Sequence, residues 1–273
     1  MVVRGSCCCD EGAGGASVDH FAPKFLIGNV LAGDNADNYS AGGFTYIADP
    51  GDGTGIAAAL ADIVASGVAA DVWIRPGTYT RGLGLARFVV PAGCAIRGAG
   101  EGAVNIITNA VDDCIFQLGA GASLERVTLT QRGVIGAAGS ALIESVGGSA
   151  LAPTRLSRVT MSTPLSVLGA QLVGGSFDID ACVVSFTGAG AAPVGISVEG
   201  GAANPAFFNI RSTVFSLVNI GVRFGFTGGV AVRDSIMQGC RFAVCFRHAK
   251  LSRCVTTSAS HEQSIACSIS AGG

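Results

Sequence analysis

Two aspartates and one arginine have the residue types and spacing that best suit catalysis in this sequence. Asp178 and Asp180 occupy alternate positions of a short apolar segment, so in a strand both carboxylates would lie on one face. Arg211 holds the position of Asp180 in the next similar segment, so these two side chains would stack. Two carboxylates beside a cation can act as acid and base in the cleavage of a glycosidic bond. We nevertheless favour an exposed ion pair worth about 0 to 1 kcal/mol, because no second column of carboxylates accompanies it.

The other polar residues do not form a recognisable metal or cofactor site. The segment Asp49–Thr54, Asp-Pro-Gly-Asp-Gly-Thr, predicts a turn and a helix start, and it lacks the alternating oxygen ligands of a calcium loop. The histidines His20, His248 and His261 lie far apart, with no partner at metal or triad spacing. We therefore predict no catalytic residue, no metal and no cofactor.

The sequence contains ten cysteines, which is many for a chain whose beginning lacks the apolar core of a signal peptide. Cys7, Cys8 and Cys9 follow one another in a Gly-rich beginning, where neighbours in sequence bridge each other poorly. We predict that they and an outward-facing Cys245 form disulfides between chains after assembly. The alternative is that these thiols are reduced and have no role. A zinc site is a weaker alternative, and its ligands would be Cys240, Cys245, Cys254 and Cys267.

A repeated seven-residue segment indicates which elements position these side chains. Each copy has an aliphatic residue, two polar or small residues and a short strand. The copies begin at Leu124, Leu156, Ile179, Ile210, Val232 and Leu251. Their spacings are 32, 23, 31, 22 and 19 residues, a mean of about 25. A constant motif at variable spacing indicates stacked coils with fixed strands and loops of different length, and we interpret the polar pair as a bend.

Alternation along these strands predicts two inward stacks and one outward row. The larger inward stack is Leu129, Met161, Val184, Phe215, Met237 and Thr256, and the smaller is Val127, Val159, Cys182, Thr213, Ser235 and Cys254. The outward row is Thr128, Thr160, Val183, Val214, Ile236 and Val255. A second strand in several coils would turn Ser197, Arg223 and Cys245 outward. An exposed flat β-branched row is unusual on a monomer, so we predict an interface at Val183, Val214, Ile236 and Val255; alternatively a loop covers the row.

The segments before the repeat resemble the beginning of pectin-lyase-like β-helix proteins, a family that includes phage tailspikes. The resemblance rests on Asp49–Val64, on Asp71–Thr80 with its Pro-Gly-x-Tyr turn, and on Val89–Gly100. It implies a cap helix from about Gly55 to Ser66. One face of that helix would carry Ile56, Leu60, Ile63 and Val64. The resemblance covers residues 44–258 and specifies no activity.

We therefore predict an all-β chain that forms a single right-handed parallel β-helix, with an antiparallel sandwich of short strands as the alternative. An extended Gly-rich arm would occupy residues 1–43. The β-helix would occupy residues 44–273, with a helix-containing cap at 44–85, coils at 86–258 and a tail at 259–273. We expect the arm to bind the major capsid protein or another virion protein. The family's phage members commonly pack side to side as homotrimers, so the resemblance also implies a homotrimer.

The composition narrows the range of functions. Charged residues make up 13% of the chain and the formal net charge is −2, without the basic excess that nucleic-acid binding needs. No apolar run approaches the roughly 18 to 20 residues of a membrane span. Aromatic side chains, the usual platforms for sugar rings, are scarce. We predict a structural virion protein, namely a capsid decoration (cement) protein assembled in the host cytoplasm. The alternatives are a tailspike-like polysaccharide lyase or hydrolase and a non-catalytic glycan-binding adhesin.

Overall fold

The computed structural model describes most of the chain between residues 24 and 257, and beyond Val222 it describes only the backbone course of the strands. The residues outside the description are 1–23, 39–42, 83–85, 101, 110–113, 133–140, 150, 164–167, 187–193, 200–207, 218–219, 225–229, 234–235, 239–241, 246–248, 253–254 and 258–273.

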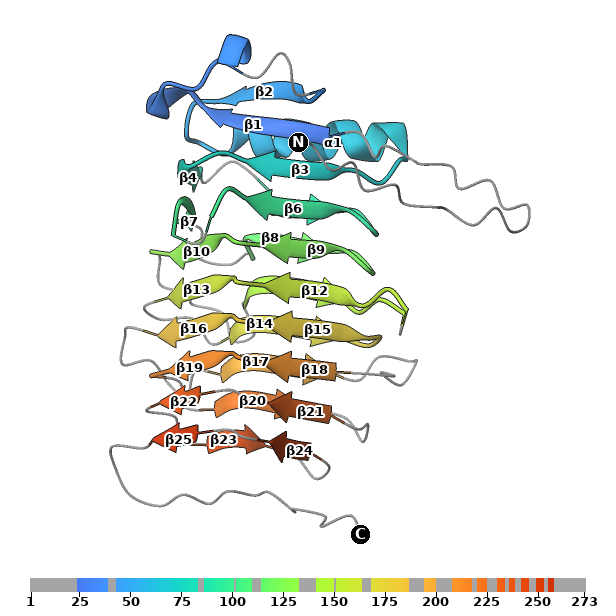
Figure 1. The fold of residues 1–273 in the computed structure, drawn as a ribbon, viewed down its shortest axis with the longest axis vertical. Coiled ribbons are helices and arrows are strands. Elements are labelled where there is room, and N and C mark those ends of the chain that lie inside the picture. Colours follow the sequence, from blue (N-terminus) through green and yellow to red (C-terminus); the bar gives the residue numbers. More distant parts are fainter. Residues whose placement is uncertain are drawn as a thin grey trace, which may run out of the picture.

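The strands wind into a single right-handed parallel β-helix, as predicted (Figure 1). Each full coil contributes one strand to each of three sheets, called here A, B and C. Sheet A, in spatial order, contains β2 (Thr45–Asp49), β1 (Lys24–Asn29), β3 (Asp71–Ile74), β6 (Ala95–Gly98), β9 (Ser123–Glu125), β12 (Thr154–Ser157), β15 (Phe177–Asp180), β18 (Phe208–Arg211), β21 (Val230–Arg233) and β24 (Ala249–Ser252).

Sheet B contains β4 (Gly77–Arg81), β7 (Val104–Thr108), β10 (Thr128–Gln131), β13 (Thr160–Thr163), β16 (Val183–Phe186), β19 (Val214–Ser216), β22 (Ile236–Gln238) and β25 (Val255–Thr257). Sheet C contains β5 (Phe88–Val90), β8 (Phe116–Leu118), β11 (Ala141–Val146), β14 (Leu168–Val173), β17 (Val194–Glu199), β20 (Ile220–Phe224) and β23 (Phe242–Cys245).

The β-helix begins earlier in the chain than we expected. Lys24–Asn29 falls within the expected arm of residues 1–43, yet it forms strand β1 between β2 and β3. Phe25 and Ile27 of this strand belong to the core, which gives the segment a reason to join the sheet. Two short 3₁₀ helices, Val30–Ala32 and Ala36–Asn38, lie between β1 and β2. The expected arm therefore reaches residue 23 at most.

One helix, α1 (Thr54–Ser66), covers the N-terminal end of the core, close to the predicted Gly55–Ser66. Ile56, Leu60 and Ile63 are buried as expected, but the Val64 side chain is 62% exposed. The helix ends at Gly67, whose left-handed backbone lets its N–H donate to the carbonyls of Ile63 and Val64.

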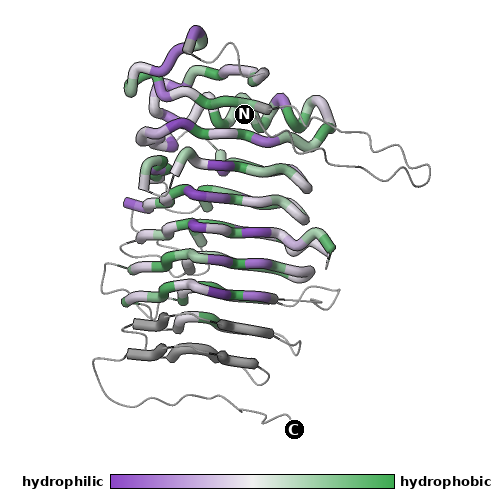
Figure 2. The backbone as a smooth tube through the Cα atoms, viewed as in Figure 1, coloured by the Kyte–Doolittle hydropathy of each residue, from purple (hydrophilic) through white to green (hydrophobic). Residues whose placement is uncertain are grey.

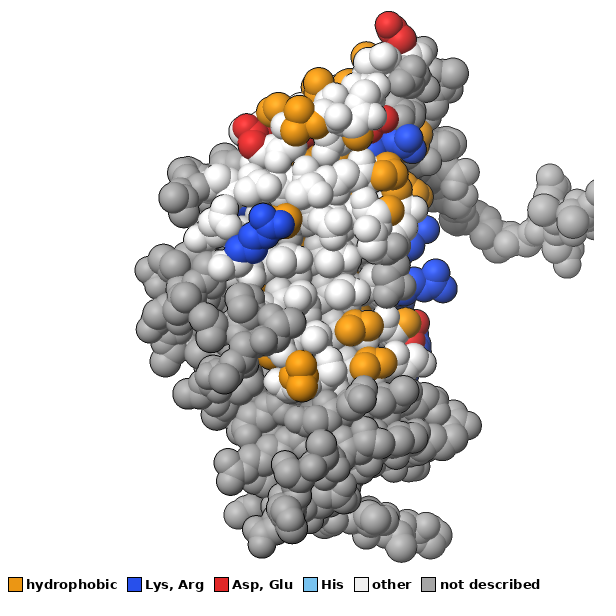
Figure 3. Space-filling model, turned by 90° about the vertical axis from the view of Figure 1, so that its left-hand side faces the viewer, with side chains coloured by type: hydrophobic (Ala, Val, Ile, Leu, Met, Phe, Trp, Pro, Cys, Tyr) orange, Lys and Arg blue, Asp and Glu red, His pale blue; other side chains and the backbone are white. Residues whose placement is uncertain are grey.

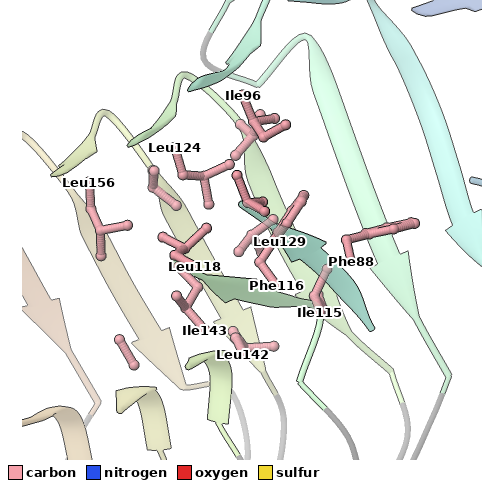
Figure 4. Close-up of a cluster of buried hydrophobic side chains, with 14 of the residues drawn as sticks. Phe88, Ile96, Ile115, Phe116, Leu118, Leu124, Leu129, Leu142, Ile143 and Leu156 are labelled. Atoms are coloured by element: carbon pink, nitrogen blue, oxygen red, sulfur yellow. The ribbon is translucent and has the colours of Figure 1, made fainter. Parts of the chain in front are cut away.

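The core is a continuous stack of aliphatic and aromatic side chains inside the coils (Figure 4). Both predicted inward stacks are buried as far as side chains are described: Leu129, Met161, Val184, Phe215, Val127, Val159, Cys182 and Thr213. Hydrophilic residues recur at the outward positions of sheet A (Figure 2). Ser197 was expected to be exposed but its side chain is buried. Of Arg223 and Cys245 only the backbone is described.

The bend between sheets A and B is a left-handed residue repeated from coil to coil. Arg126, Arg158, Ala181 and Ser212 have φ angles of 56°, 53°, 52° and 51°. The N–H of each of the first three donates to a carbonyl of the next coil, at Ser157, Asp180 and Arg211 respectively. The predicted polar-pair bend is thus confirmed, and its backbone bonds help to fix one coil on the next.

Candidate functional site

Strands β15 and β18 bring the predicted aspartates and arginine together on the outer face of sheet A. Phe177 and Ile179 point into the core with no exposed surface, so the alternate residues Asp178 and Asp180 point outward. The register of the two strands places Asp180 opposite Arg211, as the sequence predicted.

Arg211 binds both carboxylates. Its Nε donates to Asp180 Oδ1 at 2.8 Å, and one of its terminal nitrogens donates to Asp178 Oδ2 at 3.3 Å. The Asn209 side-chain amide donates to Asp178 Oδ1 at 2.8 Å. The hydrogen bond that Arg211 donates to Asp180 raises the pKa of Arg211 above its ordinary value, against a smaller opposing effect of burial. The guanidinium therefore remains charged and bridges two carboxylates of the neighbouring coil.

This arrangement suits a structural ladder better than acid–base catalysis. A general acid must present a proton to a leaving group, whereas each of these carboxylates accepts hydrogen bonds from Arg211 or from Asn209. The Arg211 side chain is 44% exposed, so the ion pairs lie at the surface and not in a closed cleft.

A second charged cluster lies higher on the same face of sheet A. Arg97 is 3.8 Å from Asp71 and 3.9 Å from Glu125, measured between nitrogen and carboxylate oxygen. The guanidinium groups of Arg97 and Arg126 lie 5.6 and 5.8 Å from the centre of the Trp73 ring, within the range of cation–π attraction. Two cations therefore contact the Trp73 ring, which leaves it poorly placed to stack on a sugar.

Tyr79, the second aromatic candidate for sugar binding, is inside the molecule. Tyr79 is fully buried, and its hydroxyl donates to the carbonyl of Arg75 at 2.8 Å. Neither Trp73 nor Tyr79 thus supplies the open aromatic platform that a glycan-binding adhesin needs.

The Asp49 carboxylate, one of the acidic residues of the cap, is a structural ligand of the backbone. It is fully buried and accepts hydrogen bonds from the N–H groups of Gly51, Asp52 and Gly53 through Oδ1, and of Gly55 and Ile56 through Oδ2. Gly55 and Ile56 are free donors in the first turn of α1, where the helix dipole also favours a negative charge, and the other three N–H groups belong to the N-cap and the turn before it. The predicted turn and helix-start role of this segment is confirmed.

Among the described residues, no three His, Cys, Asp or Glu side chains come together as metal ligands. His20, His248 and His261 lie outside these residues. No helix in the described ranges is long and apolar enough to cross a membrane.

The cysteines divide into buried and undescribed groups. Cys94, Cys114 and Cys182 are buried thiols outside any disulfide. Burial raises the pKa of the Cys94 thiol, which disfavours the reactive thiolate. Cys7, Cys8 and Cys9 lie outside the described residues, and only the backbone of Cys245 is described, so the predicted inter-chain disulfides stay a prediction.

The predicted outward row is a straight column on sheet B. The register aligns Thr128, Thr160, Val183, Val214, Ile236 and Val255 in consecutive strands. Val183 and Val214 are half-buried. The column is confirmed, and its role as an interface remains a prediction.

A buried polar ladder inside the β-helix was not predicted from the sequence. The last residues of four successive strands of sheet B, Arg81, Thr108, Gln131 and Thr163, are in register and buried. One terminal nitrogen of Arg81 donates to the Cys114 carbonyl at 2.8 Å, which links sheet B to the entry of sheet C one coil below. The signal was available, because alternation after the inward Tyr79 turns Arg81 inward as well.

An apolar groove of about 420 Å³ lies between α1 and β5. Its lining is almost entirely aliphatic: Ala57, Leu60, Ala61, Val64, Ala65, Ala86, Arg87, Phe88 and Val89. Arg87, the one charged member, donates to Glu144 at 2.8 Å. Val64 and Val89, with exposed fractions of 62% and 47%, give this groove an exposed apolar surface.

Comparisons with known proteins add little to this geometry. No known family matches the sequence, and no curated protein matches it. Among solved structures the chain is similar to the A-module of the Azotobacter vinelandii mannuronan C-5 epimerase AlgE4, with 10% sequence identity and a TM-score of 0.28. The match covers 76% of this chain and 93% of that module. A similarity of this size has no bearing on activity.

Proposed function

We propose that this chain is a non-catalytic structural protein of a virion, a capsid decoration (cement) protein that binds the particle and stabilises it. The observation that carries the proposal is that the side chains of the candidate catalytic residues bind one another. Asp178 and Asp180 are held by Arg211 and Asn209, so the carboxylates best placed for chemistry join one coil to the next.

The cap supplies a surface for attachment. The groove between α1 and β5 exposes Val64 and Val89 at the end of the β-helix where the chain enters strand β1. A contiguous exposed apolar surface is rare on monomeric proteins and more often belongs to a site of contact with a partner. In this proposal the groove and the N-terminal residues 1–23 bind the major capsid protein or another virion protein.

The proposal is tested with particles assembled with and without the chain. We expect purified protein to bind the undecorated particle and to raise the temperature at which it releases its genome. A Val64→Lys, Val89→Lys double variant should bind at least tenfold more weakly, because it places two charges in the groove. Val146→Lys, a substitution at a valine that is 54% exposed on β11, is the matched control and should bind normally. Failure of the wild-type protein to bind, or binding without a temperature shift, refutes the cement role.

The predicted disulfides are tested on the same particles. Non-reducing electrophoresis should show linked chains that collapse to monomers on reduction. Substitution of Cys7, Cys8 and Cys9 by serine should remove the links, and monomers alone in the wild type would refute them.

A tailspike-like polysaccharide lyase or hydrolase is the second candidate, favoured by the pairing of two carboxylates with a guanidinium on one face. It predicts release of unsaturated products (lyase) or of new reducing ends (hydrolase) from a panel of polysaccharides. The Asp178→Asn, Asp180→Asn double variant should abolish that activity, while Glu144→Gln on β11 should retain it. Activity lost only in the double variant would replace the structural proposal with this one.

A further inference from the structure

Two arginines bind all the carboxylates that the described strands of sheet A turn outward. Arg97 lies within 3.9 Å of two of them and Arg211 within 3.3 Å of the other two, measured between nitrogen and oxygen. The four carboxylates are those of Asp71, Glu125, Asp178 and Asp180. The other arginines of this face therefore have no carboxylate of sheet A left to bind.

Three such arginines lie between the two charged clusters. Arg126 occupies the bend after β9, Arg155 lies in β12, and Arg158 occupies the bend after β12. Asp178 is the register partner of Arg155, yet its carboxylate is bound by the next coil. No ion pair joins any of the three to a carboxylate in the described ranges. Figure 3 shows basic side chains projecting along its right-hand edge, which is the side of sheet A in Figure 1.

The fold does not need a guanidinium at these positions. Ala181 has the same left-handed bend as Arg158, with φ angles of 52° and 53°, and its N–H likewise donates to the next coil. Ser123 is the register partner of Arg155 in the adjacent coil. Arg126 and Arg158 hold equivalent positions about 4.8 Å apart, where like charges repel each other. An anion bound beside them would relieve this repulsion.

The coil that carries two of these arginines also exposes a large apolar side chain. Leu151, four residues before Arg155, is 97% exposed, and Arg155 and Arg158 are exposed as well. These three residues, called here the β12 patch, extend across sheet A over about 20 Å. Arginine is enriched at contact surfaces between proteins, and burial of an exposed leucine would stabilise a complex.

We infer that the β12 patch binds an acidic segment of another protein, one that also carries apolar side chains. A guanidinium forms paired, charge-assisted hydrogen bonds with a carboxylate, so two unpaired arginines suit neighbouring glutamates or aspartates. A single-stranded nucleic acid or an acidic glycan is less suited, because both bind largely by stacking on open aromatic rings. Arg97 and Arg126 already contact the Trp73 ring on this face. The inference does not rest on the virion role, since it concerns a different surface from the cap groove.

The test measures fluorescence anisotropy of a labelled peptide of three Glu-Glu-Leu repeats, titrated with the full chain under reducing conditions. The wild-type protein should bind the peptide, and more weakly as salt is raised, because the charges are exposed and screened. The Arg155→Ser, Arg158→Ala double variant should bind it about tenfold more weakly or less. Both replacements occur at matching positions of neighbouring coils, so the variant should fold. Arg132→Ser is the control, because Arg132 is exposed but follows β10 of sheet B, and its binding should stay within about twofold of the wild type.

A second peptide, of nine glutamates, separates the apolar contact from the charge contact. Leu151→Ser should weaken binding of the Glu-Glu-Leu peptide and leave binding of the nine glutamates unchanged. Circular dichroism establishes that each variant is folded, and Arg155→Ser alone replaces the double variant if that one is not.

Three results would overturn the inference. These are a wild-type chain that binds neither peptide, a double variant that binds as the wild type does, and an Arg132→Ser variant that loses as much affinity as the double variant. Polygalacturonate or a single-stranded oligonucleotide that binds more tightly than the peptides, and only when Arg155 and Arg158 are present, would assign the β12 patch to that polyanion instead.

Discussion

Arg211 lies opposite Asp180 in the adjacent coil and reaches past it to Asp178, so one guanidinium is shared by two carboxylates. The bond to Asp180 follows the strand register and the bond to Asp178 runs diagonally to it. Every atom of this contact lies on the outward side of sheet A. The three residues that most resemble a catalytic group therefore form an ion-pair cluster that links two adjacent coils.

The first prediction concerns the strength of the ion pair between Asp180 and Arg211. We expect a double-mutant cycle of Asp180→Asn and Arg211→Gln to give a coupling free energy of about 1 kcal/mol or less, because the arginine is 44% exposed and screened by water. The coupling should fall further in 1 M salt, where the Debye length is about 3 Å. Urea unfolding of the four proteins provides the measurement.

Arg155 and Asp178 provide the matched control for that cycle. They occupy register partners on β12 and β15 but form no ion pair, so their coupling should be near zero. A coupling for Asp180 and Arg211 above about 2 kcal/mol would show that the pair behaves as a buried one, contrary to its exposure.

The second prediction concerns the bend between sheets A and B in an early coil. A Cβ atom added to Gly98 would collide with the carbonyl oxygen of Arg126 in the coil below, which is backbone and cannot move aside. We expect Gly98→Ala to lower the free energy of unfolding by about 3 kcal/mol or more, in the range of severe overpacking. Gly82→Ala is the control, because no atom lies within 4 Å of the added Cβ. Equal unfolding midpoints for the two variants would contradict the stacking of Gly98 on Arg126.

Much of the fold is predictable from the sequence because the repeated strand keeps one register. Aligning the copies puts Asp180 beside Arg211 and Val183 beside Val214, and both neighbours are found. The position of the bend in each copy is predictable from the sequence. Its left-handed conformation at Arg126 is not, since arginine has no preference for positive φ. Backbone bonds between coils hold it there.

The parts that could not be predicted depend on contacts between coils. Strand β1 lacks the repeated motif, and it is recognisable only from its place between β2 and β3. The involvement of Asn209 follows from its register with Asp178, which a motif beginning at Ile210 does not include. The hydrogen bond from Arg81 to the Cys114 carbonyl depends on how two sheets meet at a corner, and no local pattern encodes that distance.

The third prediction concerns the start of α1. Asp49→Asn keeps one acceptor oxygen but replaces the other with an amide, which would face the N–H groups of Gly55 and Ile56. Loss of two charge-assisted hydrogen bonds at a buried site should cost about 2 to 4 kcal/mol, measured by urea unfolding. Asp52→Asn is the control, since Asp52 is exposed and its Oδ1, which the substitution can retain, accepts only from Thr54. We expect it to cost under about 1 kcal/mol, and a larger loss than that of Asp49→Asn would contradict the capping role of Asp49.

The last prediction uses the buried Tyr79 as a sensor of alkaline pH. Burial is the main cause that raises the pKa of Tyr79 above its ordinary value of 10.0, with smaller contributions from Asp49 and Asp34. The folded state therefore binds the phenolic proton more tightly than the unfolded state does. This contribution to stability is fully present below pH 10 and is lost progressively as the pH rises above it. Tyr79→Phe should lose about 1 kcal/mol near neutral pH, because the hydrogen bond to the Arg75 carbonyl is gone.

The deficit of Tyr79→Phe should then shrink, and its sign should reverse, as unfolding is followed from about pH 8 to pH 11. Burial also raises the pKa of Cys94, which lowers the stability of both proteins equally at alkaline pH. The difference between their two curves of stability against pH therefore reports the ionisation of Tyr79 alone. Phe116→Leu, at a buried aromatic residue without an ionisable group, should give a deficit that does not change with pH. A constant deficit for Tyr79→Phe over the same range would show that the phenol ionises as readily in the folded chain as in the unfolded one, and that water reaches it inside the first coil.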